Sequence, residues 1–340
     1  MPSVNRLDPI PYGSTARYIP ARGLKIPQSI GLMCVPWILK EAKAYRPDII
    51  RDHSPYTFGL ASLVSRSILD VPVVGSFLHP ETGRHGRWVE RRLLQHYSHV
   101  TTISQASFNQ LVEQSPPLEA MTSVIYPGVS PEYGPNSPSD KREWLRIKNL
   151  DGCEPIFCTA GSLVSRKNHT FLIDVFKQWS QAGRPGSMII TGTGPLETEL
   201  TRKVQEQGLT DRVLFWGYIS PLDYVALLNA STAFLFPSLM EGFGLAPAEA
   251  MACGTTAIVS DRGSLSEVVR HGTTGFVLPV DHGPGPWLEA MSKLCDNPGL
   301  RFQMSQAAMA DVRTRFSWDR TGQETADLYQ HIVQRYAKMT

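Results

Sequence analysis

From about residue 46 onward, short apolar runs alternate with longer segments whose apolar positions recur at helical spacing. The short runs predict strands at residues 49–50, 71–76, 100–103 and 123–126. The segments between them predict helices at residues 56–69, 86–97 and 105–113. Because strands that alternate with helix-length segments are typical of parallel sheets covered by helices, this part of the chain predicts an α/β domain.

A second series of the same kind follows a turn-rich stretch at residues 130–138, which we interpret as a linker. Its expected strands are residues 155–159, 187–191, 213–216, 233–236 and 256–259. Its expected helices are residues 168–181, 196–207, 222–230, 247–252 and 265–269. The tail, residues 298–339, is helical in pattern and longer than the second sheet needs, so we expect it to cross back to the first domain.

These patterns predict a first domain over residues 1–135, a second over 136–318 and a crossing helix over 319–340. The first 45 residues do not fit the scheme. A domain of this type normally opens with an apolar strand that runs into a glycine-rich turn, whereas residues 1–20 hold scattered prolines. We therefore expect a shortened first domain with less regular structure over residues 1–45 and a vacant glycine-loop position.

Composition narrows the possible classes. The 340 residues are 42% hydrophobic and 19% charged, with five cysteines that show no paired spacing, which favours a reducing compartment over a disulfide framework or a zinc site. No apolar run is long enough to span a membrane and the start does not resemble a signal peptide, so we expect a cytoplasmic protein. The net charge of +2 is too small to suggest nucleic-acid binding.

The most informative segment is residues 237–254. An apolar strand leads to Glu241, Gly242 and Gly244 permit close backbone approach, and Pro247 suits the first turn of a helix. Free amides at that helix start favour a phosphate, while Glu241 and Glu249 would bind hydroxyls of a sugar or ribose. A turn followed by a solvated Glu249 is the alternative for that residue alone, but the whole string favours a binding site.

A second element, residues 160–169, follows a strand and enters a helix. Arg166 and Lys167 lie at the helix start, where positive charge is unfavourable against the dipole, so a bound anion would relieve the conflict. A solvated basic turn is the alternative. Together with the carboxylate segment, the pair favours diphosphate binding.

The string from Glu241 through Phe243, Gly244 and Leu245 to Glu249 resembles the Glu-x7-Glu signature of the retaining glycosyltransferases of the glycosyltransferase-4 (group 1) family. Supporting matches cover residues 152–335, and looser landmarks precede them in the right order. They include Gly161 with 166–168, 191–195, 213–218, 266–269 and 316–318.

The resemblance implies a GT-B architecture of two facing Rossmann-like domains, the second holding a nucleotide-sugar donor. Carried over by residue, it implies that Arg166 and Lys167 bind the diphosphate, Glu249 the ribose and Glu241 the transferred sugar. Near the donor it further places Gly161, backbone amides of Phe243, Gly244 and Leu245, and, flanking the base, Gly217, Tyr218 and Ile219. His79 matches a histidine that approaches the sugar, with a buried structural histidine as the alternative.

The family's chemistry implies transfer with retention, in which Lys, Arg and helix amides stabilise the leaving diphosphate. We therefore expect no metal and no cofactor besides the donor, in keeping with the lack of an Asp-x-Asp sequence. A two-carboxylate glycosidase would need no phosphate site, so the basic pair argues against it. Residues 166–168 and 316–318 look most like those of mannosyltransferases, which makes GDP-mannose the first expected donor, with UDP-sugars open.

The acceptor is expected to be a saccharide or a lipid-linked saccharide. Residues Arg84 to Arg92 form a basic helix start with Trp88, suited to an anionic membrane surface on the cytoplasmic face, with a solvated helix face as the alternative. Because the opening segment is missing, a catalytically silent GT-B protein that acts as a binding or partner subunit is the competing function.

Overall fold

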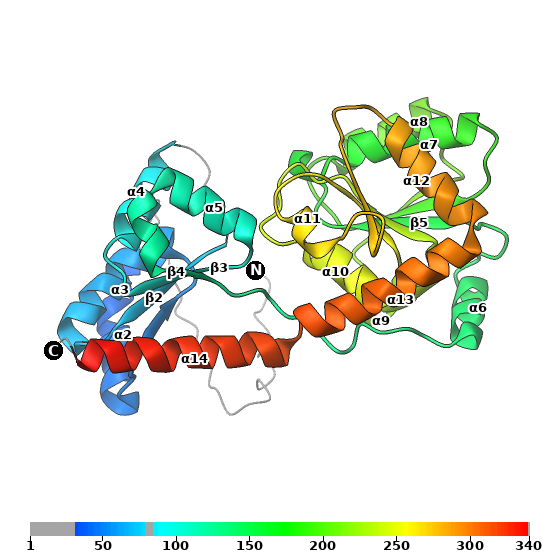
Figure 1. The fold of residues 1–340 in the computed structure, drawn as a ribbon. Coiled ribbons are helices and arrows are strands. Elements are labelled where there is room, and N and C mark those ends of the chain that lie inside the picture. The colour runs from blue at the N-terminus through cyan, green and yellow to red at the C-terminus, as the bar shows by residue number, and fades with distance from the viewer. Residues whose placement is uncertain (1–30, 79–83, 339–340) are drawn as a thin grey trace.

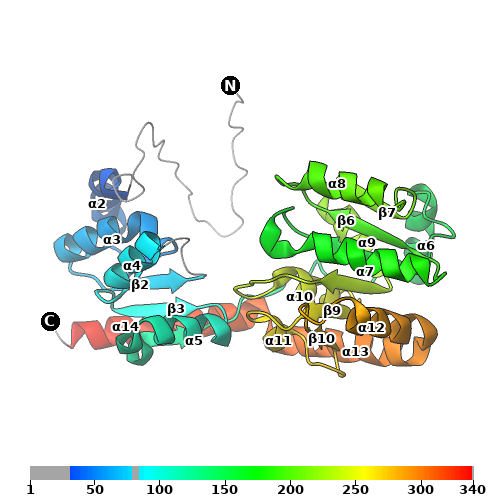
Figure 2. The same ribbon diagram turned by 90° about the horizontal axis from the view of Figure 1, so that it is seen from above.

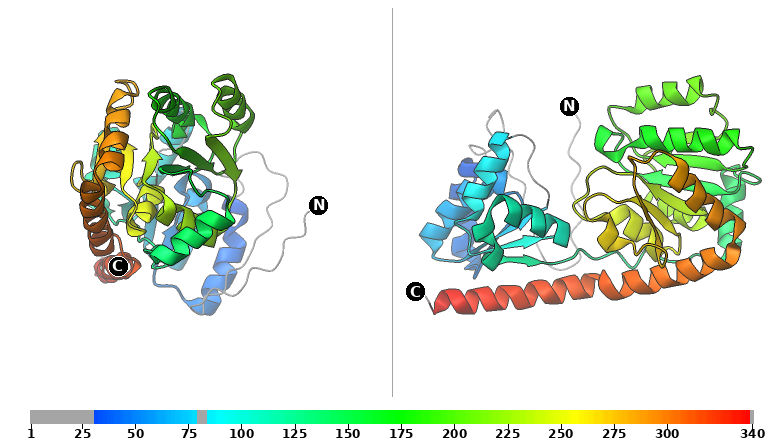
Figure 3. Two further views of the ribbon diagram at one scale, coloured as in Figure 1. Left: turned by 90° about the vertical axis from the view of Figure 1, so that its right-hand side faces the viewer. Right: turned by 45° about the horizontal axis from the view of Figure 1, so that its top comes forward.

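A computed structural model of the chain describes residues 31–78 and 84–338. It contains two α/β domains, each built on a parallel sheet and lying side by side (Figure 1). Helices α13 (Pro298–Arg315) and α14 (Trp318–Ala337) follow one another along the same side of both domains (Figure 3). The tail predicted as helical is thus two helices, because Phe316 leaves the helical conformation and Ser317 accepts the Arg320 N–H to cap α14.

The first domain is a four-stranded sheet in the order β1-β2-β3-β4. Its strands are β1 (Ile50–Asp52), β2 (Val73–Phe77), β3 (His99–Thr102) and β4 (Thr122–Val124). Its helices are α2 (Val35–Tyr45), α3 (Pro55–Leu69), α4 (Arg84–Leu94), α5 (Gln105–Gln114) and the 3-10 turn η1 (Pro116–Met121). All four predicted strands are confirmed. The expectation of irregular structure before residue 46 is wrong for α2, while residues 1–30 lie outside the described part of the chain.

The second domain is a six-stranded parallel sheet in the order β10-β9-β8-β5-β6-β7. Its strands are β5 (Ile156–Ala160), β6 (Ser187–Thr191), β7 (Val213–Gly217), β8 (Ala233–Phe236), β9 (Ala257–Ser260) and β10 (Gly275–Leu278). Its helices are α6 (Pro138–Ile147), η2 (Ser165–Lys167), α7 (His169–Gln181), α8 (Glu197–Glu206), α9 (Pro221–Ala230), α10 (Leu245–Ala252), α11 (Leu265–Val268) and α12 (Gly285–Asp296), followed by α13. The order reverses between β5 and β8, and ligands of such sheets bind beside that point.

Three elements of this domain were not predicted. Strand β10 is only four residues long, and α12 starts within a Gly-Pro-Gly-Pro sequence that is typical of a turn. Helix α6 starts at the end of the predicted linker, where Ser137 accepts the Asp140 N–H and a proline occupies the first turn. Such prolines are tolerated there, because the first helical N–H has no partner within the helix.

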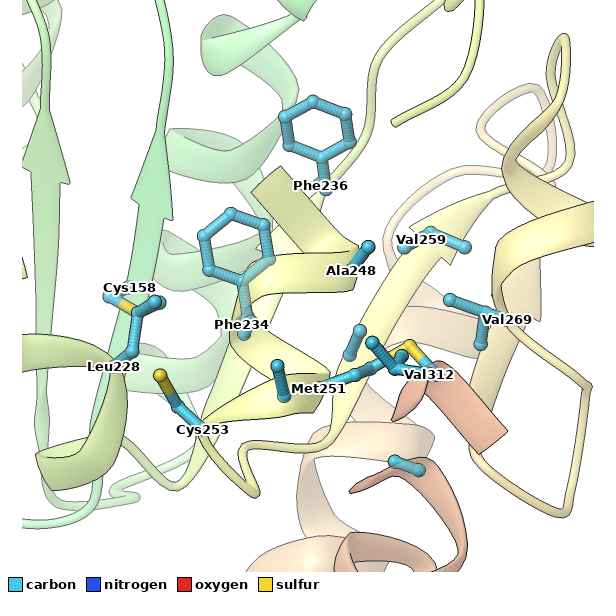
Figure 4. Packing of buried hydrophobic residues seen from close by; sticks show 14 of the residues in the cluster. Cys158, Leu228, Phe234, Phe236, Ala248, Met251, Cys253, Val259, Val269 and Val312 are labelled. Atoms are coloured by element: carbon cyan, nitrogen blue, oxygen red, sulfur yellow. The ribbon is translucent and has the colours of Figure 1, made fainter. Parts of the chain in front are cut away.

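Apolar layers bury both faces of the second sheet. On one face α10 packs through Ala248 and Met251 against Phe234, Val259 and Val312, as Figure 4 shows from close by. Fully burying side chains of this size stabilises the fold by roughly 1.5–3 kcal/mol for each large residue. The helix start that the sequence predicts as an anion site is therefore part of a firmly packed core.

Helix α14 contacts the first domain along its length. Thr321 donates to the Tyr126 carbonyl (2.7 Å) near its start, and the Tyr336 hydroxyl bonds Asp70 (3.1 Å) near its end. Between these points the Arg51 guanidinium lies over the Tyr329 ring. The Val129 N–H also bonds the Phe316 carbonyl (2.8 Å), so the linker and the α13–α14 break form one double crossing between the domains.

Candidate active site

A cavity of about 330 Å³ opens at the carboxyl ends of β5, β6 and β7, beside the reversal of strand order. Of the predicted site residues, it brings together Gly161, Gly217, Tyr218, Ile219 and Glu249. Its other lining residues are Tyr133, Ala160, Thr191, Gly192, Pro221, Tyr224 and Ala246. Five predicted residues from four separate segments thus meet at one cavity.

Glu249 lies half-buried on α10 at the wall of this cavity. Burial raises the pKa of its carboxyl, and the hydroxyls of Tyr224 and Tyr133 oppose that rise by bonding the charged form. Burial together with Glu249 raises the pKa of Tyr133 to about 12, so this phenol remains a donor at neutral pH. The sequence did not reveal either tyrosine, because Tyr133 lies in the linker and Tyr224 on α9, far from Glu249 in the chain.

A second group of predicted residues surrounds Glu241. Its Oε1 accepts hydrogen bonds from Lys167 Nζ (2.6 Å), Ser238 Oγ (2.6 Å) and Arg166 Nη1 (3.1 Å). Lys167 and Glu241 expose only 11% and 10% of their side chains, whereas Arg166 exposes 52%. The structure therefore separates the basic pair into an inner lysine and an outer arginine.

Burial lowers the pKa of Lys167, although the Glu241 carboxylate opposes that shift. The ammonium also lies 4.5 Å from the centre of the Phe236 ring, a favourable cation–π position. Removing a buried lysine's carboxylate partner is costly unless another anion replaces it. The cluster can therefore exchange its internal carboxylate for the oxygens of an anionic ligand.

The loop between Glu241 and α10 is shaped by two glycines. Gly244 has φ +102°, a conformation that side chains rarely adopt, and a Cβ there would lie 2.7 Å from the Leu265 side chain. A Cβ at Gly242 would lie 2.5 Å from the Leu78 carbonyl of the first domain. Phe243 is buried, so this residue offers the cleft only its backbone, and Leu245 is 46% exposed.

A second cavity of about 380 Å³ lies between the domains. It is lined on one side by residues of α5 and on the other by the Glu241 loop. Its lining residues are Ala106, Ser107, Asn109, Gln110, Glu113, Leu239, Met240, Glu241, Gly242 and Gly263. Glu241 is thus the predicted residue that reaches the space between the two domains.

Two further predictions fall at the edge of the described chain. His79 lies outside the described residues, and so do residues 80–83. Arg84 to Leu94 form α4, where Trp88 is 53% exposed and the Arg92 guanidinium lies over its ring. Arg91 instead donates to the Gln114 carbonyl (3.0 Å) within the fold.

Within residues 31–78 and 84–338, no group of three or more His, Cys, Asp or Glu side chains is placed to hold a metal ion. Over the same residues, no helix combines the length and the apolarity that crossing a membrane requires.

Comparison with known proteins identifies the family. Residues 140–311 match the family described as glycosyl transferases group 1, and residues 7–133 match Glycosyltransferase Family 4. The α-D-kanosaminyltransferase of Streptomyces kanamyceticus is 24% identical over 316 residues, which cover 87% of this chain and 81% of that protein.

Two solved structures share the architecture. Anabaena HepE, in complex with UDP and glucose, has a TM-score of 0.78 at 22% identity and covers 90% of this chain and 84% of its own. A glycosyltransferase from Rickettsia africae has a TM-score of 0.80 at 18% identity, with 93% and 84% covered. The fold predicted from the sequence is confirmed as GT-B, and the chain belongs to the group 1 glycosyltransferases.

Proposed function

We propose that the chain transfers a hexose from a nucleoside-diphosphate sugar to a hydroxyl of a saccharide or lipid-linked acceptor, with retention of configuration. The observation that carries the proposal is the buried contact of Lys167 with Glu241 next to the cavity that holds Glu249. A cation for a diphosphate, one carboxylate for ribose hydroxyls and one for sugar hydroxyls then follow one another along a single ligand.

Lys167 and Arg166 are the proposed diphosphate ligands. As the C1–O bond of the sugar breaks, negative charge grows on the leaving phosphate, and the buried Lys167 ammonium stabilises it. Glu241, released from Lys167 by the phosphate, turns its oxygens to the hydroxyls of the sugar. This exchange keeps a partner for each charge before and after the donor binds.

Retention follows from attack on the same face. The acceptor oxygen forms its bond to C1 on the side from which the phosphate leaves, and the acceptor proton passes to an oxygen of that phosphate. Neither Glu241 nor Glu249 then has to form a covalent intermediate. Because Lys167, Arg166 and the backbone amides of residues 243–245 supply the compensating charge, we propose that transfer needs no metal and no further cofactor.

Glu249 is the proposed ribose ligand, and residues 217–219 flank the base. Glu249 is the only carboxylate among the described lining residues of that cavity. Uracil needs one acceptor and one donor, which main-chain groups of residues 217–219 can supply, whereas guanine carries several N–H donors. We therefore propose a UDP-sugar, with the GDP-mannose expected from the sequence as the second donor to test; the UDP complex of HepE supports this order.

The acceptor is proposed to enter the cavity between α5 and the Glu241 loop, with His79 near the sugar. A lipid-linked acceptor would bring α4 to an anionic membrane surface through Trp88 and Arg92. Charge reversal at Arg87 and Arg92 should then weaken sedimentation with anionic vesicles and leave donor hydrolysis unchanged. Arg91 is left intact, because it bonds Gln114 within the fold.

The deciding experiment screens UDP- and GDP-sugars by calorimetry and then measures donor turnover with saccharide acceptors, with and without EDTA. Binding of one nucleotide sugar, with EDTA-insensitive turnover and an α-configured product from an α-donor by NMR, is the expected result. Binding without any turnover would favour the silent binding subunit instead. EDTA-sensitive turnover or an inverted product would overturn the proposed mechanism.

A further inference from the structure

Helix α11 of the second domain directs one carboxylate onto the first domain. Glu267 accepts the Gln105 N–H at Oε2 (2.8 Å) and the Ala106 N–H at Oε1 (2.7 Å). These amides open α5, where the first N–H groups lack partners within the helix. Charge-assisted hydrogen bonds and the helix dipole both favour a carboxylate at this position. Figure 2 shows α5 and α11 facing one another across the two domains.

The Tyr126 hydroxyl completes this contact by donating to Glu267 Oε2 (2.8 Å). Burial, followed by the bond to Glu267, raises the pKa of Tyr126 to about 12, which keeps the donor protonated. The Tyr126 ring packs against Phe243 and Phe316, with centroids 6.0 and 5.5 Å away. We call the Glu267 carboxylate, the amides of Gln105 and Ala106 and the Tyr126 hydroxyl the interdomain clasp.

The clasp is fixed to the second domain from behind. Arg315 donates to the main-chain carbonyls of Glu267 (2.7 Å) and Val268 (3.1 Å). Ser264, just before α11, donates to the Phe243 carbonyl (2.8 Å), with a longer contact to the Glu241 carbonyl (3.2 Å). One short segment, residues 264–267, therefore holds both the Glu241 loop and the start of α5.

We propose that Glu267 is a positioning residue for sugar transfer, which sets where the first domain lies against the Glu241 loop. This inference rests on the proposed function, since only a reaction shared by two domains depends on their alignment. Domains joined by a linker move relative to one another unless a specific interface holds them. Misplacing reacting groups by about 1 Å can cost about 100-fold in rate, whereas nucleotide binding needs only the second domain.

Three variants grade the clasp. Glu267→Ala removes every bond, and Glu267→Gln leaves one acceptor while turning an NH2 group toward a backbone N–H. Tyr126→Phe keeps the ring packing and removes one bond. Glu289→Gln is the matched control, because this exposed glutamate of the second domain pairs only with Lys293 on its own helix.

We expect turnover of the donor with acceptor to fall by about 10- to 100-fold in Glu267→Ala, less in Tyr126→Phe and not in the control. The affinity for UDP and the melting temperature should remain within error of the wild type. Small-angle scattering should show a larger radius of gyration for Glu267→Ala. A cap that only stabilises α5 would lower the melting temperature without separating turnover from UDP affinity.

Wild-type turnover in Glu267→Ala, or equal losses of UDP affinity and turnover, would overturn the proposal. If the wild type itself turns over no donor, the proposed function fails and the clasp is judged separately. In that case a larger radius of gyration with unchanged UDP affinity supports interdomain positioning, and an unchanged radius overturns it.

Discussion

The two domains bury their sheets in different ways. The second sheet lies between two extensive apolar layers, whereas the first has one compact apolar cluster around Val73, Phe77 and Val100. Polar groups take a larger share elsewhere in the first domain. Buried Asp52 accepts bonds from the Ser54 N–H (2.9 Å), Ser62 (2.9 Å) and the Tyr97 hydroxyl.

The same contrast appears where the first domain meets α14. Arg51 donates to Thr101 (2.5 Å), and His99 bonds Ser123 (2.9 Å), on the sheet near that helix. Burial, followed by the charge of Arg51, lowers the pKa of His99 to about 4. The comparison teaches that the second domain is a self-sufficient platform for the nucleotide, while the first is held in place by α14 and the interdomain clasp. Variants in the two domains should therefore affect different measurements.

The largest expected effect comes from the second domain's buried cation. Lys167→Ala should lower turnover by about 100-fold or more, because it removes charge stabilisation that grows in the transition state. UDP affinity should fall as well. Turnover and calorimetry check this against Lys293→Ala, which removes an exposed lysine of the same domain. Equal behaviour of the two variants would remove Lys167 from the site.

Glu241→Ala should impair turnover and preserve UDP affinity. Without Glu241 the Lys167 ammonium loses its internal partner, so UDP should bind as tightly as before or more tightly. Calorimetry with UDP and turnover with the donor sugar separate the two effects. A variant that keeps full turnover would contradict the assignment of Glu241 to the transferred sugar.

The pH dependence of UDP binding should report on Glu249. Because burial raises its pKa, this carboxyl takes up a proton at higher pH than an ordinary glutamate, and UDP affinity should fall as the pH drops through that range. In the free protein the raised pKa acts the opposite way on folding: stability is greater when the carboxyl is protonated and declines as the pH rises through the folded-state pKa. Calorimetry at several pH values checks the first effect.

In Glu249→Gln the pH dependence of UDP binding should disappear while the weaker affinity remains. A wild-type affinity that stays constant as the pH falls would show that Glu249 does not contact the ribose.

The smallest effect should be confined to the first domain. Tyr97→Phe leaves one bond to buried Asp52 unmade and should destabilise the protein by about 1–3 kcal/mol. UDP affinity should not change, because the second domain is untouched. Urea unfolding checks the loss against Tyr45→Phe, which alters an exposed tyrosine. A loss of UDP affinity in Tyr97→Phe would contradict the independence of the two domains.

Much of the second domain could be predicted because its signals are local. Strands such as 187–191 and 233–236 match the observed bounds, and the glycines around Glu241 mark a helix start that favours anions. Helix α12 and strand β10 escaped prediction since their composition is typical of turns or too short to show a period. The irregular start expected before residue 46 failed for α2, whose apolar positions are interrupted by a proline at its first turn.

The sequence by itself determined the two α/β domains, the family and the residue types that meet a diphosphate sugar, because periodicity and motif spacing act over a few turns of chain. Only the tertiary structure decided which groups share a proton or a charge. Glu267 and Gln105 are 162 residues apart, and Lys167 and Glu241 are 74 apart, yet each pair lies within hydrogen-bond distance. Contacts of such separation depend on how strands order in the sheet and how α14 returns to the first domain. No local pattern encodes that order, because each element buries its apolar face equally well before its neighbours are chosen.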